Sequence, residues 1–178
     1  MNVITGTARG RKLLSPSNDV TRPTAGVVKE AIFNIIQFEV EGAKVLDLFA
    51  GSGQLGIEAL SRGAAGCTFV ESNKEVCEVI ERNLRSTGFF GFSRVENVLA
   101  EVFLKRAGVL FDIAILDPPY AEGIINKVMP SVVRLMAENG VIICEAAKAD
   151  TLDERFGKYK LIREYRYGKR KLGLFRSV

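Results

Sequence analysis

Four consecutive residues, Asp117, Pro118, Pro119 and Tyr120, carry the side chains best suited to chemistry in this chain. They follow the apolar run 109–116, which predicts a buried strand, so they stand where that strand runs into a loop. In open α/β sheets this is the usual place for a ligand crevice. Asp117 and the Pro118 carbonyl offer acceptors for N–H protons, and Tyr120 offers a flat ring. The stretch therefore suits methylation of a nucleobase amino group, although a proline-rich turn capped by Asp is the simpler alternative.

A glycine-rich segment upstream predicts a ligand-binding loop. Gly51, Gly53 and Gly56 fit the pattern G-x-G-x-x-G, with a strand expected before them and a helix after them. Without side chains the backbone can approach a ligand closely, and a helix N-terminus favours polar or anionic groups. Glu71, at the end of the next expected strand, can accept hydrogen bonds from ribose hydroxyls.

Asp47 discriminates between the two cofactor classes that such a loop can hold. It lies inside the expected strand before the loop, where a carboxylate is costly to bury without a partner. S-adenosylmethionine (SAM) carries a sulfonium and an α-amino group that would supply one, whereas the pyrophosphate of a nicotinamide dinucleotide would be repelled. The pattern favours SAM, with a backbone-bonded core Asp as the structural alternative.

Strand and helix patterns alternate from residue 44 onward. Five strands interleaved with helices favour a parallel sheet covered on both faces, and the last two strands form an antiparallel hairpin. We predict a doubly wound, Rossmann-like α/β fold with a mostly parallel seven-stranded sheet. Residues 1–40 form a small basic appendage of hairpin and helix, and residues 41–178 the SAM-dependent domain. The expected strands are 44–49, 66–71, 92–97, 111–116, 141–146, 158–167 and 169–176; the expected helices are 26–38, 54–62, 74–87, 101–107 and 122–138.

Composition excludes several kinds of chemistry. The 178 residues include no histidine, so histidine-based triads, bases and metal ligands are ruled out. The three cysteines, Cys67, Cys77 and Cys144, lack metal-ligand spacing, so we expect no metal site. We expect them to be buried thiols in a reducing cytoplasm. No apolar run is long enough for a membrane span, and the N-terminus has no signal-peptide form.

The net charge of +4 is unevenly distributed. Residues 1–31 carry a net +3, residues 155–178 a net +8, and the middle, 32–154, a net −7. Basic ends that fold onto one side would make a phosphate-binding surface, while solvated ends are the ordinary alternative. The residues that we expect to contact RNA are Arg9, Arg11, Lys12, Arg22, Lys169, Arg170 and Lys171.

With these motifs placed, the chain resembles class I SAM-dependent methyltransferases and, more narrowly, the RsmD-type bacterial 16S rRNA (guanine-N2)-methyltransferases. The narrower resemblance rests on residues 6–13, on Arg22-Pro23-Thr24 and on Ala31-Ile32-Phe33-Asn34, besides Asp-Pro-Pro-Tyr. It implies SAM as methyl donor and the N2 of a guanine in small-subunit rRNA as acceptor. It also implies a monomeric cytoplasmic enzyme that meets its RNA in a 30S assembly intermediate.

The resemblance also assigns roles to residues. Asp117, Pro118 and Tyr120 become the catalytic set, with Tyr120 stacked on the target base. The family usually places Asp or Asn near the SAM adenine, whereas Leu99 stands there in this chain, which leaves the backbone of Leu99 or Ala100, or the side chain of Asn97 or Glu101, to read the adenine. The expected cofactor-binding residues are Asp47, Phe49, Gly51, Ser52, Gly53, Glu71, Ser72, Leu99, Ala100 and Asp117.

Three alternatives stay open at the level of sequence. Asp-Pro-Pro-Tyr suits adenine N6 or cytosine N4 as well, so the enzyme could methylate those amines in DNA or RNA. The chain could be a non-catalytic RNA-binding module that kept the fold, which the two intact motifs argue against. A nicotinamide oxidoreductase is disfavoured by Asp47 and by Asp-Pro-Pro-Tyr.

Overall fold

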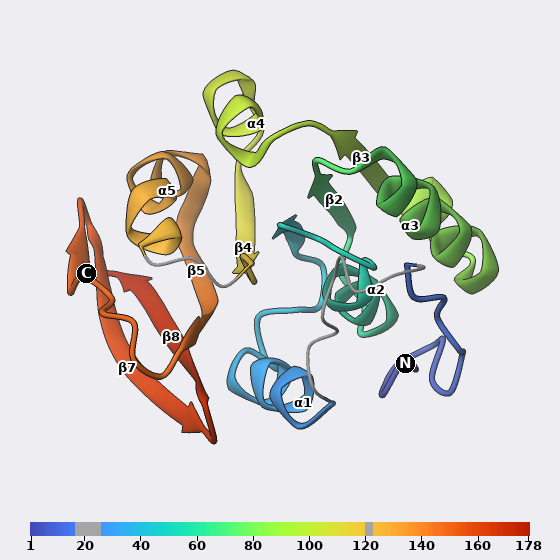
Figure 1. Cartoon of the computed structure of the whole chain (residues 1–178), viewed down its shortest axis with the longest axis horizontal. Coiled ribbons are helices and arrows are strands. Elements are labelled where there is room, and N and C mark those ends of the chain that lie inside the picture. Colours follow the sequence, from blue (N-terminus) through green and yellow to red (C-terminus); the bar gives the residue numbers. More distant parts are fainter. Residues whose placement is uncertain (17–25, 120–122) are drawn as a thin grey trace.

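A computed structural model describes residues 1–16, 26–119 and 123–178 of the chain. Within these residues a single sheet has the strand order β3-β2-β1-β4-β5-β8-β7-β6 (Figure 1). The strands are β1 Lys44–Leu48, β2 Gly66–Glu71, β3 Ser93–Asn97, β4 Phe111–Leu116, β5 Met136–Ala147, β6 Arg155–Phe156, β7 Tyr159–Tyr167 and β8 Arg170–Ser177. The helices are α1 Gly26–Ile35, α2 Gln54–Ser61, α3 Lys74–Thr87, α4 Ala100–Arg106 and α5 Ile124–Val132, with 3-10 turns η1 Phe90–Phe92 and η2 Val133–Leu135.

The sheet combines a parallel part with an antiparallel end, as the alternation of patterns predicts. Strands β3, β2, β1, β4 and β5 run parallel, and β8, β7 and β6 pair antiparallel beyond β5. Helices α1, α2 and α3 pack on one face and α4 and α5 on the other, each through its apolar side (Figure 1). Among the helices of the described residues, none is long and apolar enough to cross a membrane.

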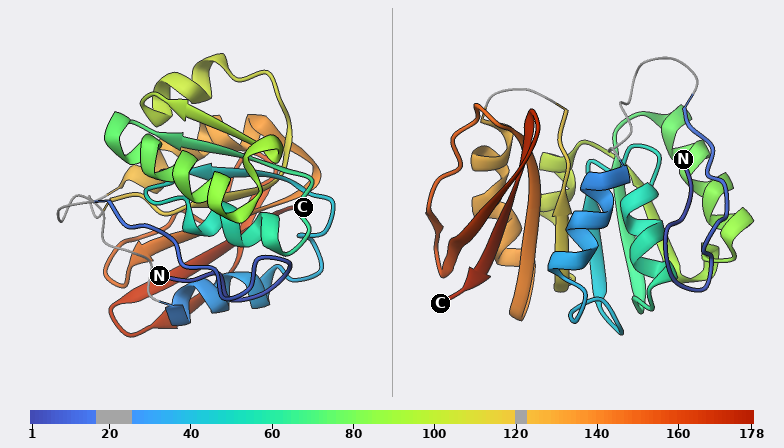
Figure 2. Two further views of the ribbon diagram at one scale, coloured as in Figure 1. Left: turned by 90° about the vertical axis from the view of Figure 1, so that its right-hand side faces the viewer. Right: turned by 90° about the horizontal axis from the view of Figure 1, so that it is seen from below.

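The first 16 residues pack onto the α2 side of the sheet. An isolated bridge joins Asn2 to Lys12, so the expected N-terminal hairpin is present in minimal form. Val3 and Leu13 are buried in the same apolar cluster as Phe33 of α1 and Ile57 of α2. The N-terminal segment and α1 therefore share the core of the sheet. Figure 2 places this segment and the C-terminus at opposite ends of the molecule.

The structure departs from the predicted elements at several ends and in the number of strands. The helix expected over 26–38 ends at Ile35. The helix expected over 122–138 ends at Val132, and β5 begins at Met136, because Phe111 of β4 pairs with Met136 before the expected strand starts. The register then shifts around Asn139, which adopts a φ of 62° in an Asn-Gly pair of the kind that marks turns. The prediction of seven strands was one short, because Arg155–Phe156 pairs with β7 as the two-residue β6.

Candidate active site

The two motifs meet at the switch point of the sheet. β1 lies between β2 and β4, so the chain leaves β1 in one direction and returns to its other side with β4. Asp47 is in register with Ile115, and Leu48 with Leu116, the residue before Asp117. The loops after β1 and β4 therefore open side by side at the carboxyl edge of the parallel strands, where open α/β sheets bind ligands.

The loop after β1 folds tightly because three of its residues take left-handed backbone angles. Phe49, Gly51 and Gly53 have φ of 70°, 53° and 76°. The Ala50 N–H donates to the Val70 carbonyl at 2.9 Å, which fixes the loop against β2. A Cβ on Gly53 would lie 3.1 Å from Ile80, so the loop has a glycine where both conformation and space require one.

Asp47 is buried beneath this loop with half of its carboxylate unpaired. Its side chain is 1% exposed, and Oδ2 accepts a hydrogen bond from the Gly56 N–H at 2.9 Å. Oδ1 has no hydrogen-bond partner among the described residues. Burial raises the pKa of the Asp47 carboxyl to about 8; the Gly56 hydrogen bond opposes this shift, and the charges of Asp117 and Glu71 add to it. A cationic group at Oδ1 would relieve both the missing hydrogen bond and the cost of the buried charge.

Glu71 links the glycine loop to the end of β2. Its Oε2 accepts from the Gly51 N–H at 3.1 Å, and Oε1 accepts from the Asn73 N–H at 2.9 Å. The Ser72 hydroxyl lies 3.5 Å from the same Oε1. A carboxylate has about four acceptor sites, so Glu71 keeps one for a ribose hydroxyl.

The third strand and α4 border the same edge, and their contacts narrow the four adenine-reading alternatives. The Asn97 amide donates to the carbonyls of Glu71 and Ser72, at 3.1 and 2.9 Å. Glu101 forms an ion pair with Lys127 at 2.7 Å. The amide nitrogen of Asn97 and the carboxylate of Glu101 are thus engaged with other groups. Leu99 is 61% exposed at the start of α4, with Ala100 as the first helical residue, so these contacts favour the backbone of these two residues as the adenine-facing candidate.

The loop that carries Asp117 begins directly after β4. Asp117 is half-buried, Pro118 is buried and Pro119 is exposed. Tyr120, predicted to stack on the base, lies outside the described residues, as does Arg22. Asp117 is close enough to Asp47 for its charge to raise the pKa of that carboxyl. The structure thus brings Asp47, the glycine loop, Glu71 and Asp117 together at one edge.

Comparison with known proteins shows which family this chain belongs to. The family described as Conserved hypothetical protein 95, which is the RsmD family, matches residues 1–176. The chain belongs to this family. Ribosomal RNA small subunit methyltransferase D of Escherichia coli (strain K12) is 39% identical over 146 residues, which cover 82% of this chain and 71% of that protein. YlbH of Bacillus subtilis (strain 168) is 36% identical, with 94% of each chain covered. The solved structure of yhhF from Escherichia coli has a TM-score of 0.89 and 34% identity, and covers 99% of this chain and 97% of that one. The protein is a SAM-dependent methyltransferase of the RsmD type.

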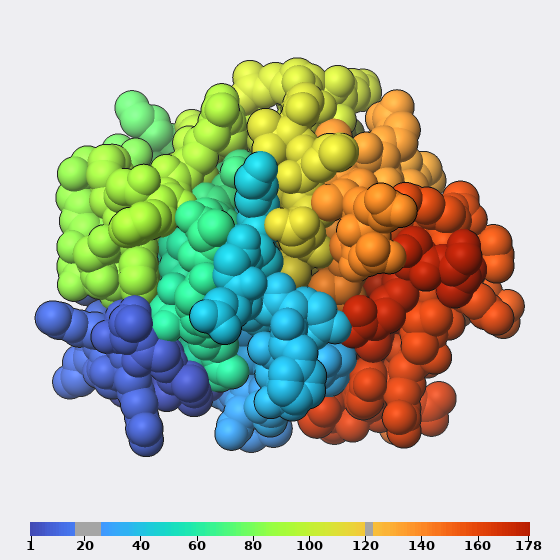
Figure 3. Space-filling model, turned by 180° about the vertical axis from the view of Figure 1, so that it is seen from behind, coloured from blue at the N-terminus to red at the C-terminus, as the bar shows by residue number. Residues whose placement is uncertain are grey.

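Within the described residues, the two basic ends of this methyltransferase lie apart and do not form one continuous patch. Figure 3 shows the blue N-terminal segment and the red C-terminal hairpin at opposite ends of the molecule, with lighter blue residues between them. Arg9, Arg11 and Lys12 are exposed, but the turn that carries Arg9 lies beside Ser61 at the far end of α2, away from the carboxyl edge.

Two of the three predicted RNA contacts at the β7–β8 turn are engaged within the protein. Lys171 is 5% exposed and donates to Glu164 at 2.6 Å, so it cannot reach an RNA and is removed from the predicted surface. Arg170 is bound to the buried Glu145. Lys169 remains exposed. Successive side chains along β8 point to opposite faces of the sheet, so Lys171 is turned onto a covered face. A run of basic residues in the sequence does not reveal this.

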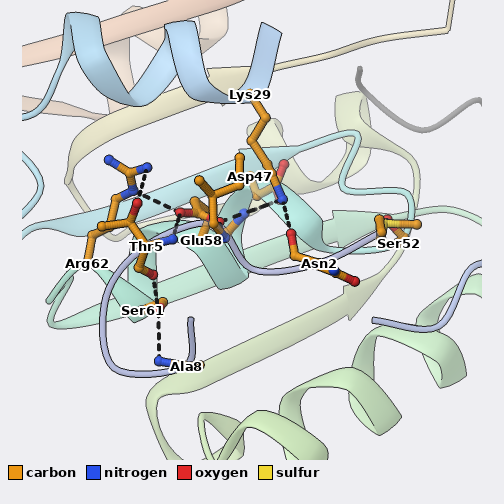
Figure 4. Close-up of polar contacts among 12 residues, drawn as sticks. Asn2, Thr5, Ala8, Lys29, Asp47, Ser52, Glu58, Ser61 and Arg62 are labelled. Atoms are coloured by element: carbon orange, nitrogen blue, oxygen red, sulfur yellow. Dashed lines mark hydrogen bonds and ion pairs between the residues drawn. The ribbon is translucent and has the colours of Figure 1, made fainter. Parts of the chain in front are cut away.

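Sequence reasoning missed Glu58, the anchor of the N-terminal segment (Figure 4). Its fully buried carboxylate accepts from the N–H groups of Ile4 and Thr5, at 2.8 and 3.0 Å, and from Arg62 at 2.9 Å. Lys29 lies 3.6 Å away, and burial lowers the pKa of its ammonium group. The one signal in the sequence is an acid among the apolar positions of α2, which by itself does not name a partner 54 residues away.

Asn83 was missed as well, and it connects α3 to the glycine loop. Its buried amide accepts from the Leu14 N–H at 2.7 Å and donates to the carbonyls of Leu14 and Ser52, each at 3.1 Å. One side chain thus holds both the N-terminal segment and the loop of the active site in place. An Asn on the buried side of an amphipathic helix is the only hint that the sequence offers.

Proposed function

We propose that this methyltransferase transfers the methyl group of SAM to the exocyclic N2 of a guanine in 16S rRNA. The observation that carries the proposal is a buried aspartate with an unpaired oxygen, Asp47, beside the loop that begins at Asp117. An rRNA substrate is supported by the relative named ribosomal RNA small subunit methyltransferase D. Guanine N2 as the target is supported by the family resemblance over residues 6–34.

The cofactor residues divide the work along the carboxyl edge. Asp47 Oδ1 would accept from the α-amino group of SAM, while Gly51 and Gly53 let the backbone of the loop approach the methionine part. Glu71 would accept from a ribose hydroxyl, and the backbone N–H groups of Leu99 or Ala100 would face the adenine. Phe49 and Ser72 lie on the same two loops and would complete the contact surface. Ser52 is buried with its hydroxyl on Met1 Sδ, so it would contribute through the backbone of the loop. When bound, SAM supplies an electrophilic methyl group on a sulfonium.

The Asp117 loop would orient the amine. The lone pair of the guanine amine is delocalised into the ring, which makes it a poor nucleophile. Acceptors from the Asp117 carboxylate and the Pro118 carbonyl would turn both N–H groups out of the ring plane and localise the lone pair on nitrogen. Asp117 Oδ or water would then hold the proton that the alkylated amine releases, so no histidine is needed. Stacking on Tyr120 would offset part of the cost of extruding the base.

The proposed setting is a partly assembled small ribosomal subunit, with the protein acting as a monomer in the cytoplasm. Cys67, Cys77 and Cys144 are free and buried, as expected of thiols in a reducing compartment.

Asp117→Ala tests the proposed chemistry. It should lower methyl transfer to 16S rRNA by at least about 100-fold, while the affinity for SAM stays within a few-fold of wild type. Glu138→Ala, which removes an exposed carboxylate near the start of β5, at the opposite edge of the sheet from Asp117, is the matched control and should change neither quantity. Turnover by Asp117→Ala comparable to that of the control would remove Asp117 from the mechanism.

A further inference from the structure

A bulge in β7 turns two side chains, Tyr165 and Tyr167, toward α1. Leu161 pairs with Phe175 of β8, but Arg163 pairs with the next residue, Leu174, so Ile162 is an extra residue in the strand. An extra residue reverses which side chains face each side of the sheet. Leu161, before the bulge, packs against the apolar cluster under α5. Tyr165 and Tyr167, after it, pack against the cluster under α1.

These side chains line a groove between α1 and β7. The groove is open to solvent and has a volume of about 510 Å³. It is lined by Tyr165 and Tyr167 on one side and by Val27, Glu30, Ala31, Asn34 and Ile35 on the other. That volume lies within the range of small-ligand sites, about 300–1,000 Å³. The tyrosines are half-buried and Asn34 is exposed. In the space-filling view of Figure 3, blue residues that include α1 lie against the red C-terminal hairpin.

The groove and the Asp117 loop lie at the same height along the strands, three strands apart in the sheet. Tyr165 is in register with Leu172 of β8, and Leu172 with Glu145 of β5. Leu116 of β4 pairs with Cys144 of β5, so the residues that follow them, Asp117 and Glu145, lie side by side. Three strand spacings separate Tyr165 from Asp117, or about 14 Å. This is about four nucleotides at the spacing of a stacked strand.

The groove combines what a nucleotide in a single strand requires. Two aromatic rings offer stacking surfaces, and the guanidinium of Arg163 lies 5.2 Å from the centre of the Tyr165 ring. Asn34 and Glu30 offer hydrogen-bond groups for a base edge. Arg163, Arg166 and Lys169 are exposed around the strand end, which favours a polyanion. Glu30 is the acid among the lining residues and would face the base, not the phosphates.

We propose that this groove is a second nucleotide subsite, which holds a single-stranded nucleotide of the substrate RNA a few positions from the extruded guanine. The inference rests on the proposed function and deepens it. Tyr165 and Tyr167 stack the base, Asn34 hydrogen-bonds its edge and Arg163 neutralises its phosphate. The subsite would fix which guanine reaches Asp117, a choice that Asp-Pro-Pro-Tyr alone does not make.

The test uses small ribosomal subunits from a strain that lacks this methyltransferase. Replacing Tyr165 and Tyr167 together by Ala should raise the KM for subunits at least about tenfold, with kcat and the affinity for SAM within twofold of wild type. Replacing both by Phe keeps the rings and should restore the KM. Asn34→Ala and Arg163→Gln should each raise the KM several-fold, whereas the exposed control variants Gln37→Ala and Lys158→Gln should not.

A photo-crosslinking p-benzoylphenylalanine in place of Tyr165 identifies the occupant. Crosslinks to 16S rRNA within a few nucleotides of the methylated guanine support the subsite. Crosslinks to a ribosomal protein, or a KM that is unchanged in the Ala pair, would overturn it. If the wild-type protein methylates the subunits and the Ala pair does so with an unchanged KM, the proposed function survives and the subsite fails. If the wild type transfers no methyl group to RNA, both fail.

Discussion

The carboxylate of Asp47 accepts a hydrogen bond from the Gly56 N–H at 2.9 Å, which joins the centre of the sheet to the first turn of α2. The second oxygen of this carboxylate is unpaired among the described residues. Burial raises the pKa of the Asp47 carboxyl to about 8. The ionised Asp47 carboxylate therefore destabilises the folded, ligand-free protein, and a cationic ligand would stabilise it.

Asp47→Asn should stabilise the ligand-free protein at alkaline pH. The folded pKa of about 8 lies above the ordinary value of 3.8, so the folded state binds more protons between these pH values. The contribution of Asp47 to stability is full below about pH 4 and is lost as the pH rises through 8. We expect the variant to have a Tm at least about 3 °C higher than wild type at pH 9, with the difference vanishing near pH 4. Asp153→Asn is the control, and a variant less stable than wild type at pH 9 would contradict this account.

SAM binding should release a proton from Asp47. At pH 6.5 the buried carboxyl is protonated, and pairing with a cationic α-amino group requires its ionised form. Calorimetry in buffers of different ionisation enthalpy should show release of about one proton per SAM bound. Asp47→Asn should abolish this release and weaken SAM binding by about 10–100-fold. Equal proton release by wild type and variant would show that Asp47 does not bind the α-amino group of SAM.

Asn83→Ala should loosen the glycine loop. The change leaves the Leu14 N–H and the Ser52 carbonyl without their partner, at a cost of about 2–4 kcal/mol in the free energy of unfolding. It should also weaken SAM binding several-fold, because Ser52 belongs to the loop. Arg82→Ala, an exposed neighbour on α3, is the control for both measurements. A variant with wild-type stability and SAM affinity would show that the loop does not depend on this amide.

Gly56→Ala should destabilise the protein through overpacking. A Cβ at this position would lie 2.3 Å from Phe69 Cε1 and 2.6 Å from Cys67 Sγ, both buried. Overpacking of this kind costs about 1–3 kcal/mol, which corresponds to a fall in Tm of about 3–10 °C. Gly91→Ala, where an added Cβ meets open space, should leave the Tm unchanged. Equal Tm values for the two variants would mean that the α2–β2 contact is more tolerant than its geometry indicates.

The features that sequence predicted are those fixed by local pattern. The strands 66–71 and 111–116 and the helix 74–87 have the predicted bounds, because hydrophobic period and capping residues act over a few positions. Asp47, Gly53, Glu71 and Asp117 meet because strand ends of a parallel sheet share an edge. Their order along the chain was enough to predict that meeting.

The features that sequence did not predict depend on long-range register. Glu58 and Asn83 pair with backbone groups more than 50 residues away, which no local pattern encodes. Lys171 was misassigned because the face of a strand residue follows from pairing, not from charge. The bulge at Ile162, which aims Tyr165 at α1, is visible only once β7 is placed on β8.

The identity of the methylated nucleoside tests the central claim most directly. Small ribosomal subunits from a strain that lacks the protein should be incubated with purified protein and isotope-labelled SAM, and their rRNA should then be digested and analysed by mass spectrometry. We expect the label in N2-methylguanosine at a single position, which is unmethylated in the mutant strain and methylated in its parent. Label in N6-methyladenosine or N4-methylcytidine would contradict the guanine assignment, and absence of label from any nucleoside would contradict the proposed activity.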